Sequence, residues 1–370
     1  MIFGIITHTV HKIKEGQIYA YEPYVREMNL WGKYVDEIII VAPVSVNEII
    51  SIDAPYNHSN IKVITIPNFD TTSIKNTFRS ILVIPKICRS IYKVMKQVNH
   101  IHLRCPGNVG LLGCIVQVFF PLKSKTAKYA GNWDPKSKQP ITYRLQKWIL
   151  RNTFLSKNIK VLVYGNWPKK SKNILPFFTA SYQQHEIKEI AKKNFNSKIK
   201  LLFVGAFSIG KQPMLSVKAT HKLINKGHNI SLDMYGNGSD FIKVKKYIND
   251  NELYNDIKLH GNQSKEIVKQ AFQKSHFLVF ISKSEGWPKV VAESMFWSCL
   301  PISTKVSCVP YMLDYGHRGA LINDDLDEVV EKIESYIAHK KRYAEHVENA
   351  KKWSQQFTLD AFEEAIKELI

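Results

Sequence analysis

Residues 275–296 read SHFLVFISKSEGWPKVVAESMF, and this stretch decides the fold. It opens with a nearly continuous apolar run of strand length, and after Pro288 the apolar residues recur with helical spacing. The sequence therefore predicts a buried strand, a short loop and a helix. Glu285 falls on the loop and Glu293 falls inside the helix. In open α/β sheets, ligands bind beyond the carboxyl ends of the strands, which is where the loop with Glu285 begins.

The two glutamates of this stretch are separated by seven residues. As an isolated spacing this means little, because Glu285 could cap the helix and Glu293 could lie on its solvated face. Three features favour a ligand site. Gly286 allows close approach of the backbone, carboxylates accept hydrogen bonds from the vicinal hydroxyls of sugars, and a helix N-terminus attracts phosphate.

A second candidate segment, residues 201–213, reads LLFVGAFSIGKQP. It predicts a strand, a turn at Gly205, and Lys211 near the start of a helix, where its charge could neutralise a diphosphate. The glycine spacing is not that of a Walker A loop, and a solvated surface lysine is the alternative. Another glycine turn follows at Gly236, within the sequence YGNG.

Across about residues 199–330, the order and spacing of five residues resemble the signature of the retaining glycosyltransferases of family 4. These residues are Gly205, Lys211, Gly236, Glu285 and Glu293. The resemblance implies an α/β chain of GT-B fold, with two Rossmann-like, doubly wound parallel-sheet domains facing a central cleft. It implies that Lys211 and Glu285 are catalytic. Lys211 would bind the donor diphosphate, Glu285 the hydroxyls of the transferred sugar, and Glu293 the ribose. Gly205, Gly236, Gly286 and Val290 would complete the donor site.

The sequence departs from the family pattern at several places. Ala206 stands where the family usually carries arginine, and the glycine-rich turn after the first strand is absent. Cys308 begins a Cys-Val-Pro-Tyr segment where Gly-x-Pro-Glu is common. These departures keep a non-catalytic GT-B scaffold open as an alternative function.

Strand-like runs alternate with helical patterns, which predicts two doubly wound, mostly parallel sheets. The predicted strands of the first sheet are residues 1–7, 37–42, 61–66, 100–104, 126–130 and 159–164, and those of the second are residues 200–204, 230–235, 257–259, 276–281, 300–304 and 320–322. We expect an acceptor-side domain over residues 1–185 and a nucleotide-sugar domain over residues 186–352, with a polar linker near 170–198. Residues 353–370 have a helical pattern, and the resemblance implies that they cross back to the first domain.

Candidates for the acceptor side come from the first domain. His102 and Arg104 lie at the end of a predicted strand, and Asn132 lies on a loop after the next strand, where the family often carries histidine. For His102, which alternates with apolar residues along its strand, the alternative is a core or sheet-edge role.

The net charge of +20 is concentrated in residues 62–172, which hold 21 Lys and Arg against two acids, Asp70 and Asp134. Such a region predicts an anionic partner: a membrane surface, a pyrophosphate-linked acceptor or nucleic acid. The basic amphipathic segments 86–98 and 143–151 could lie in a membrane interface or pack on the core. Because the chain contains no recognised nucleic-acid module, we expect no nucleic acid, although a basic nucleic-acid-binding protein is the alternative function.

The cysteines form no C-x-x-C pair and the N-terminus has no leader pattern, so we expect a cytoplasmic protein peripheral to the inner face of the cell membrane. Asp325 and Asp327 precede a helical pattern and predict a helix cap, so no metal and no cofactor are expected. The predicted function is sugar transfer from a nucleoside-diphosphate sugar to a lipid-linked or polysaccharide acceptor, in cell-surface polysaccharide or lipopolysaccharide biosynthesis.

Overall fold

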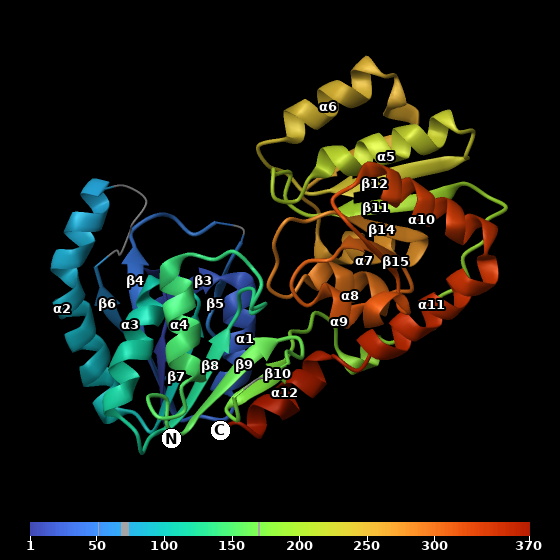
Figure 1. Cartoon of the computed structure of the whole chain (residues 1–370). Helices are drawn as coiled ribbons and strands as arrows, with labels where there is room; N and C mark the ends of the chain where they lie inside the picture. Colours follow the sequence, from blue (N-terminus) through green and yellow to red (C-terminus); the bar gives the residue numbers. More distant parts are fainter. Residues whose placement is uncertain (51, 68–73, 169–170) are drawn as a thin grey trace. The chain divides into compact units, whose positions relative to one another are not determined.

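The computed structural model describes residues 1–50, 52–67, 74–168 and 171–370. Asp70, Lys169 and Lys170 of the basic region therefore lie outside the described residues. The chain divides into two compact units (Figure 1). The first unit comprises Met1–Phe177 and Phe362–Ile370, and the second comprises Phe178–Ala361. The observed division thus follows Phe177, whereas the sequence predicted a domain boundary after residue 185.

A mostly parallel sheet forms the centre of the first unit, with strand order β10-β9-β8-β7-β1-β4 and with β6 also paired to β4. Six of these strands coincide with predicted ones, while β10 lies in the predicted linker. The strands are β1 (Ile2–Ile6), β4 (Glu37–Ser45), β6 (Ile61–Ile66), β7 (His100–Cys105), β8 (Ser124–Tyr129), β9 (Ile159–Tyr164) and β10 (Ile174–Phe177).

Three further strands extend this sheet beyond β4 and were not predicted: β2 (His11–Lys14), β3 (Gln17–Tyr21) and β5 (Asp53–Pro55). β3 runs antiparallel to both β2 and β5. These strands are short, and exposed side chains interrupt their apolar pattern. They therefore lack the buried apolar run by which the parallel strands are recognised.

The helices of the first unit flank its sheet, and α3 and α4 lie on one face of it (Figure 1). The apolar residues Ile87, Ile91, Val94, Met95 and Val98 of the long helix α2 are buried in the core. This face therefore packs on the sheet, and the interpretation of segment 86–98 as a membrane-interface helix is wrong for that face. The helices are α1 (Glu22–Gly32), α2 (Ile74–Gln97), α3 (Asn108–Val116), α4 (Ile141–Arg151), and α12 (Leu359–Lys367), which begins in the second unit.

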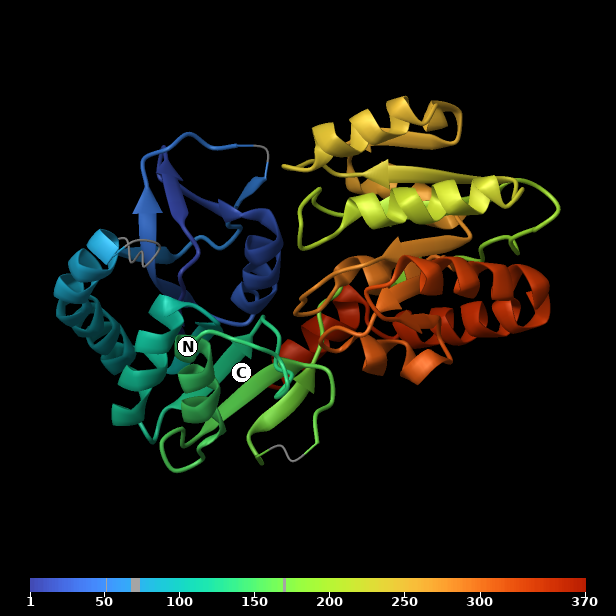
Figure 2. The same cartoon turned by 45° about the horizontal axis from the view of Figure 1, so that its top comes forward.

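The second unit has a fully parallel sheet of order β13-β12-β11-β14-β15-β16, and each of its strands matches a predicted one. Helices α5 and α10 lie side by side on it (Figure 2). The strands are β11 (Ile199–Val204), β12 (Ile230–Tyr235), β13 (Ile257–Gly261), β14 (Phe277–Phe280), β15 (Leu300–Thr304) and β16 (Ala320–Ile322).

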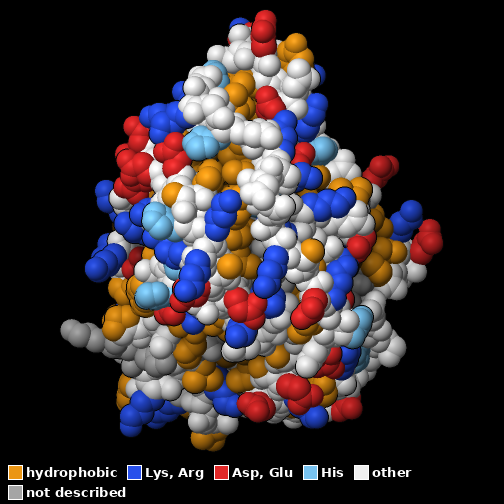
Figure 3. Space-filling view, turned by 90° about the vertical axis from the view of Figure 1, so that its right-hand side faces the viewer, with side chains coloured by type: hydrophobic (Ala, Val, Ile, Leu, Met, Phe, Trp, Pro, Cys, Tyr) orange, Lys and Arg blue, Asp and Glu red, His pale blue; other side chains and the backbone are white. Residues whose placement is uncertain are grey.

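Seven α-helices connect and extend these strands in the second unit: α5 (Pro213–Asn225), α6 (Phe241–Asp250), α7 (Lys265–Lys274), α8 (Lys289–Phe296), α9 (Val309–Met312), α10 (Leu326–Ala338) and α11 (Lys340–Ser354). Short 3-10 turns occur at Gln117–Phe119, Gln184–Glu186, Leu253–Asn255 and Asp314–Gly316. Within the described ranges, no helix is both long and apolar enough to cross a bilayer. On the face drawn in Figure 3, basic and acidic side chains are interspersed.

Candidate active site

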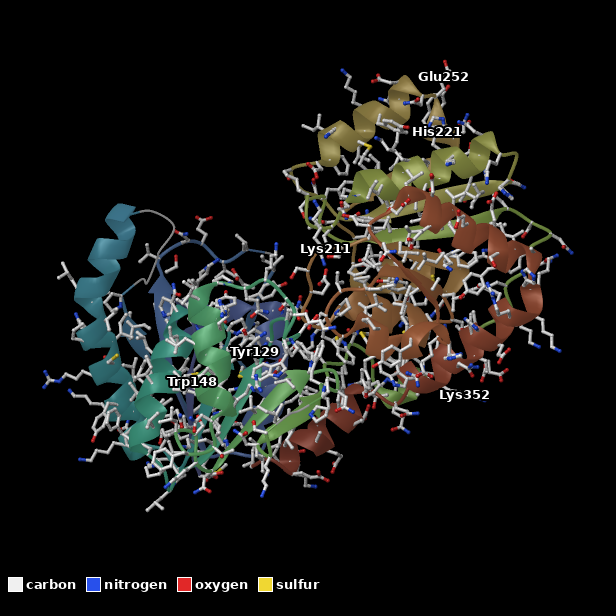
Figure 4. All side chains as sticks on the ribbon, viewed as in Figure 1. Tyr129, Trp148, Lys211, His221, Glu252 and Lys352 are labelled. Atoms are coloured by element: carbon white, nitrogen blue, oxygen red, sulfur yellow. The ribbon has the colours of Figure 1, made fainter. Side chains whose placement is uncertain are left out.

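Lys211 and Glu285 form an ion pair in the second unit, Nζ to Oε1. Lys211 lies between β11 and α5, where Figure 4 labels it, and Glu285 lies between β14 and α8. The Glu285 carboxylate also accepts a hydrogen bond of 2.6 Å from Ser282 Oγ. The side chains of Lys211 and Glu285 are 27% and 11% exposed. The structure thus brings together the two residues predicted as catalytic, at the carboxyl ends of neighbouring parallel strands.

Backbone contacts hold the two loops in place. The amide of Lys283 donates to the carbonyl of Gly210, at 2.9 Å, and so joins the Glu285 loop to the Lys211 loop. Thr304 Oγ1, at the end of β15, accepts from the amide of Ser282 at 3.0 Å and donates to its carbonyl at 2.7 Å. The ion pair is therefore positioned by the ends of three adjacent strands. Such preorganised polar groups are what electrostatic catalysis requires.

Gly236 packs against the backbone of Gly205 so closely that position 236 has no room for a side chain. Gly236 has φ of +129°, and a Cβ there would lie 1.9 Å from the carbonyl oxygen of Gly205. The amide of Gly205 bonds the carbonyl of Tyr235 at 3.0 Å. Glycine is therefore required at position 236, whereas a Cβ at Gly205 would make only an ordinary contact of 3.8 Å with Phe203.

Gly286 and Val290 lie at the start of α8. The carbonyl of Gly286 accepts from Ser307 Oγ at 2.9 Å and from Cys308 Sγ at 3.2 Å. Burial raises the pKa of Cys308 to about 12, so its thiol stays protonated and can donate. The Cys308 departure from the family pattern thus supplies a contact that fixes Gly286. Val290 is half-buried in the first turn of the helix.

Glu293 projects from the middle of α8 and is half-buried. Its Oε1 accepts a hydrogen bond from Ser181 Oγ, and the carbonyl of Ser181 accepts from Lys265 Nζ. Ser181 and Ser282, each bonded to one of the two glutamates, were not predicted. A lone serine carries no sequence signal of its own, and the Ser181–Glu293 contact joins residues 112 positions apart.

His102, predicted on the acceptor side, is 0% exposed in the first unit. Its Nδ1 shares a hydrogen bond of 2.8 Å with Thr126 Oγ1, to which His100 Nε2 also bonds at 2.9 Å. Burial, reinforced by the nearby charge of Arg104, lowers the pKa of His102 to about 3. His102 is therefore a neutral core residue with no surface for a ligand.

Arg104 is also largely enclosed. Its Nη1 donates to Glu27 Oε1 on α1 at 2.8 Å, and Lys128 Nζ lies 3.7 Å from the same oxygen. Burial alone would raise the pKa of Glu27, but Arg104 and Lys128 hold it at about 2. Glu27 was not among the predicted site residues. Its position between the apolar residues Val25 and Met28 of a helix indicates a buried acid, which requires a cationic partner.

Asn132, the third acceptor-side candidate, lies half-buried on the loop after β8. Its Oδ1 accepts from the amide of Asp134 at 2.9 Å, and its carbonyl accepts from Gln139 Nε2. Asn132 therefore organises a loop at the carboxyl end of the first sheet. The structure does not bring it into contact with His102, which belongs to the core.

Among the described residues there is no cluster of three or more histidines, cysteines and acids that could hold a metal ion. Asp325 begins helix α10, and its Oδ1 accepts from the amide of Asp327 at 2.7 Å. The prediction that this Asp-Leu-Asp segment caps a helix is confirmed.

Comparison with known proteins identifies a family and two curated relatives that match part of this chain. Residues 185–353 match the family described as "Glycosyl transferases group 1". An uncharacterized glycosyltransferase of Methanocaldococcus jannaschii is 29% identical over 158 residues, which cover 42% of this chain and 43% of the relative. Poly(glycerol-phosphate) alpha-glucosyltransferase of Bacillus subtilis is 30% identical over 148 residues, covering 39% and 20%. The chain thus spans less than half the length of the curated relatives it matches.

A solved structure matches nearly the whole chain. The Anabaena protein HepE, in complex with UDP and glucose, covers 99% of this chain and 98% of its own, with a TM-score of 0.65 and 14% identity. At that identity the likeness establishes the fold. The predicted α/β class and GT-B fold are confirmed.

Proposed function

We propose that this chain is a retaining glycosyltransferase of family 4 that transfers a sugar from a nucleoside-diphosphate sugar to a lipid-linked or polysaccharide acceptor. The observation that carries the proposal is the ion pair between Lys211 and Glu285 at the carboxyl edge of the second sheet. The group 1 match covers both residues. HepE, of similar fold, is described with UDP and glucose.

In this proposal, the donor diphosphate competes with Glu285 for the ammonium group of Lys211. Binding of the diphosphate releases the Glu285 carboxylate, which is then able to accept hydrogen bonds from hydroxyls of the transferred sugar. Glu293 accepts from the ribose hydroxyls. The glycines at positions 205, 236 and 286 let the backbone approach the donor closely, and Val290 is a further residue of the proposed donor site.

The transfer step proceeds on one face of the sugar through an oxocarbenium-like state. The bond from the anomeric carbon to the diphosphate oxygen breaks, and a bond to the acceptor oxygen forms on the same face. The proton of the acceptor hydroxyl passes to the departing phosphate. Lys211 stabilises the negative charge that develops there, together with the N-terminal amides of α8.

We further propose that the first unit faces an anionic membrane, at the inner face of the cell membrane, during cell-surface polysaccharide or lipopolysaccharide synthesis. Phe119, Leu122 and Phe154 are exposed apolar residues on the turns after α3 and α4. Asn158 Nδ2 joins these turns by donating to the carbonyl of Pro121 at 2.9 Å. From residue 100 to 185 the sequence holds one acid, Asp134, so the surrounding charge favours anionic lipid.

The test of the donor proposal is a thermal-shift screen with UDP-, GDP- and ADP-sugars. A donor that binds the native state raises the melting temperature by mass action. We expect one nucleotide series to stabilise wild type and to have little effect on Lys211→Ala. If none of the three series stabilises the protein, the donor-site proposal is wrong, and the non-catalytic scaffold becomes the better description.

Binding of anionic vesicles and of an oligonucleotide at equal ionic strength tests the partner of the basic region. We expect vesicle binding, weakened when Phe119, Leu122 and Phe154 are replaced by serine. Preference for the oligonucleotide would instead support the nucleic-acid alternative.

A further inference from the structure

A groove of about 620 Å³ runs along helix α4 of the first unit. One wall is α4, with Arg144, Lys147, Trp148 and Arg151; the other includes Asp134 and Gln139 on the loop after β8. Arg144, Trp148 and Arg151 follow the helical spacing that places side chains on one face. Figure 4 labels Trp148 on this helix. We call this feature the α4 groove.

Hydrogen bonds hold the loop wall of the α4 groove in place. Asp134 Oδ1 accepts from the amide of Lys136 at 2.8 Å, and its carbonyl accepts from Ser137 Oγ at 2.7 Å. Gln139 Nε2 reaches back to the carbonyl of Asn132. The groove is therefore preformed, which lowers the entropic cost of binding.

The charge of the α4 groove is strongly positive. Three cationic side chains, Arg144, Lys147 and Arg151, face one carboxylate, Asp134, which already accepts from the backbone. Neither Arg144 nor Arg151 has an ion pair or side-chain hydrogen bond with any residue that the structure describes. Two guanidinium groups that have no partner among the described residues, on one helix face, offer bidentate hydrogen bonds to phosphate or carboxylate.

Lys147 is positioned differently from the two arginines. Its Nζ lies 5.7 Å from the ring centroid of Tyr129 and 5.6 Å from that of Trp133. Burial lowers its pKa to about 8; Asp134 opposes this effect and Arg151 adds to it. Lys147 is thus mostly charged at neutral pH and adds a third cation at the base of the groove.

Trp148 gives the α4 groove an apolar contact surface, since its side chain is 58% exposed. The flat indole can pack against the C–H face of a sugar ring, while Ser137, Gln139 and Asn152 offer hydrogen bonds to hydroxyls. A bilayer is too flat to fill a concave groove. Single-stranded nucleic acid generally stacks on several aromatic residues, whereas the groove exposes one.

We propose that the α4 groove binds a carbohydrate chain that carries phosphate or carboxylate groups. A sugar ring packs on Trp148, and the acidic groups bind Arg144 and Arg151. The ligand class rests on the proposed function, because a polymeric acceptor extends beyond its reacting hydroxyl. The groove would then hold acceptor segments that take no part in the chemistry.

Direct binding measurements on the full chain test this proposal without requiring activity. The probes are a polygalacturonate oligomer, a phosphorylated dextran oligomer and neutral dextran, titrated calorimetrically. We expect at least one acidic probe to bind and dextran not to bind. The double variant Arg144→Gln/Arg151→Gln should weaken binding about 100-fold and Trp148→Ala about 10-fold. The two acidic probes distinguish a phosphate preference from a carboxylate preference.

Matched controls are Arg89→Gln, an exposed arginine on α2, and Tyr254→Ser, an exposed aromatic residue of the second unit. Neither should change probe affinity. The inference is wrong if groove variants bind the acidic probes as wild type does, if dextran binds equally well, or if only an oligonucleotide or anionic vesicles depend on the groove arginines. Donor stabilisation is measured on the same variants, so failure of the donor screen and failure of glycan binding are separate results.

Discussion

Each unit contains a carboxylate paired with a cation near the carboxyl end of its parallel sheet, but the two pairs differ in exposure. Lys211 and Glu285 lie on loops and are 27% and 11% exposed. Arg104 and Glu27 are 13% and 7% exposed, and fully buried Lys128 joins them. A pair on loops can exchange its partner for a ligand, whereas an enclosed pair is locked in place because separating it would leave an uncompensated buried charge. The presence of an ion pair near a strand end is therefore insufficient to identify a ligand-binding site.

Replacing Lys211 should give the largest functional effect. Removing one preorganised charge that stabilises the transition state typically lowers kcat by about 100- to 1,000-fold, or about 2.7–4 kcal/mol. We expect Lys211→Ala to show this loss in a sugar-transfer assay, with little change in melting temperature because the residue is partly exposed. Lys243→Ala, an exposed lysine on α6, is the matched control.

The companion variant Glu285→Gln separates the two roles of the loop pair. It frees Lys211 from its carboxylate partner, so affinity for the free nucleoside diphosphate should be retained or increased while transfer falls. If UDP, GDP and ADP all bind Glu285→Gln more weakly than wild type, Lys211 and Glu285 do not compete in the way proposed. Equal transfer by Lys211→Ala and wild type would remove Lys211 from the mechanism.

Replacing Glu27 should affect stability instead. Its folded-state pKa of about 2 lies below the usual glutamate value of 4.5, so its contribution is present above pH 4.5 and is lost as the pH falls toward 2. This shift corresponds to about 3 kcal/mol at neutral pH. We expect Glu27→Gln to lower the free energy of unfolding by that order at pH 7, and the difference from wild type to shrink in acid. Denaturant unfolding at several pH values measures it.

Glu22→Gln provides the matched control on the same helix, since Glu22 pairs with Arg26 at an exposed position. Exposed pairs contribute about 0–1 kcal/mol, so this variant should unfold nearly as wild type does. A pH-independent loss in Glu27→Gln would mean that the carboxylate charge is not what stabilises the first unit. Donor affinity should be unchanged in Glu27→Gln and Glu22→Gln, because both residues lie in the first unit and the proposed donor site lies in the second.

The sequence predicted the second sheet better than the first for a physical reason. Strands buried on both faces appear as apolar runs, as in Phe277–Phe280, whereas the short strand His11–Lys14 has no such run. The candidate residues follow the same division. Loop residues such as Lys211 and Glu285 were assigned from local motifs, but the burial of His102 depends on Thr126 from another strand. Long-range partners of this kind cannot be read from local spacing.

Among the replacements of Lys211, Glu27 and Glu293, that of Glu293 should have the smallest effect. It tests whether this partly exposed residue of α8 binds the donor. Glu293 is half-buried, and its carboxylate accepts a hydrogen bond from Ser181. Glu293→Gln keeps an acceptor oxygen but removes the charge that would bind ribose hydroxyls. Hydrogen bonds to charged groups contribute about 1.5–3 kcal/mol, so we expect the donor KM to rise about 10-fold. kcat should change little.

Ser181→Ala shows whether the Ser181 contact accounts for any effect at Glu293. This variant removes the hydroxyl that donates to Glu293 but leaves the charge of the Glu293 carboxylate. Donor KM should therefore stay within about 3-fold of wild type, a change smaller than the loss of one hydrogen bond to a charged group would cause. If Ser181→Ala and Glu293→Gln raise KM equally, Glu293 acts by holding the 178–182 segment, and its role is structural. If only Glu293→Gln raises KM, the carboxylate itself meets the donor. Glu285, in the loop before α8, would then act on kcat, and Glu293, within α8, would act on donor affinity.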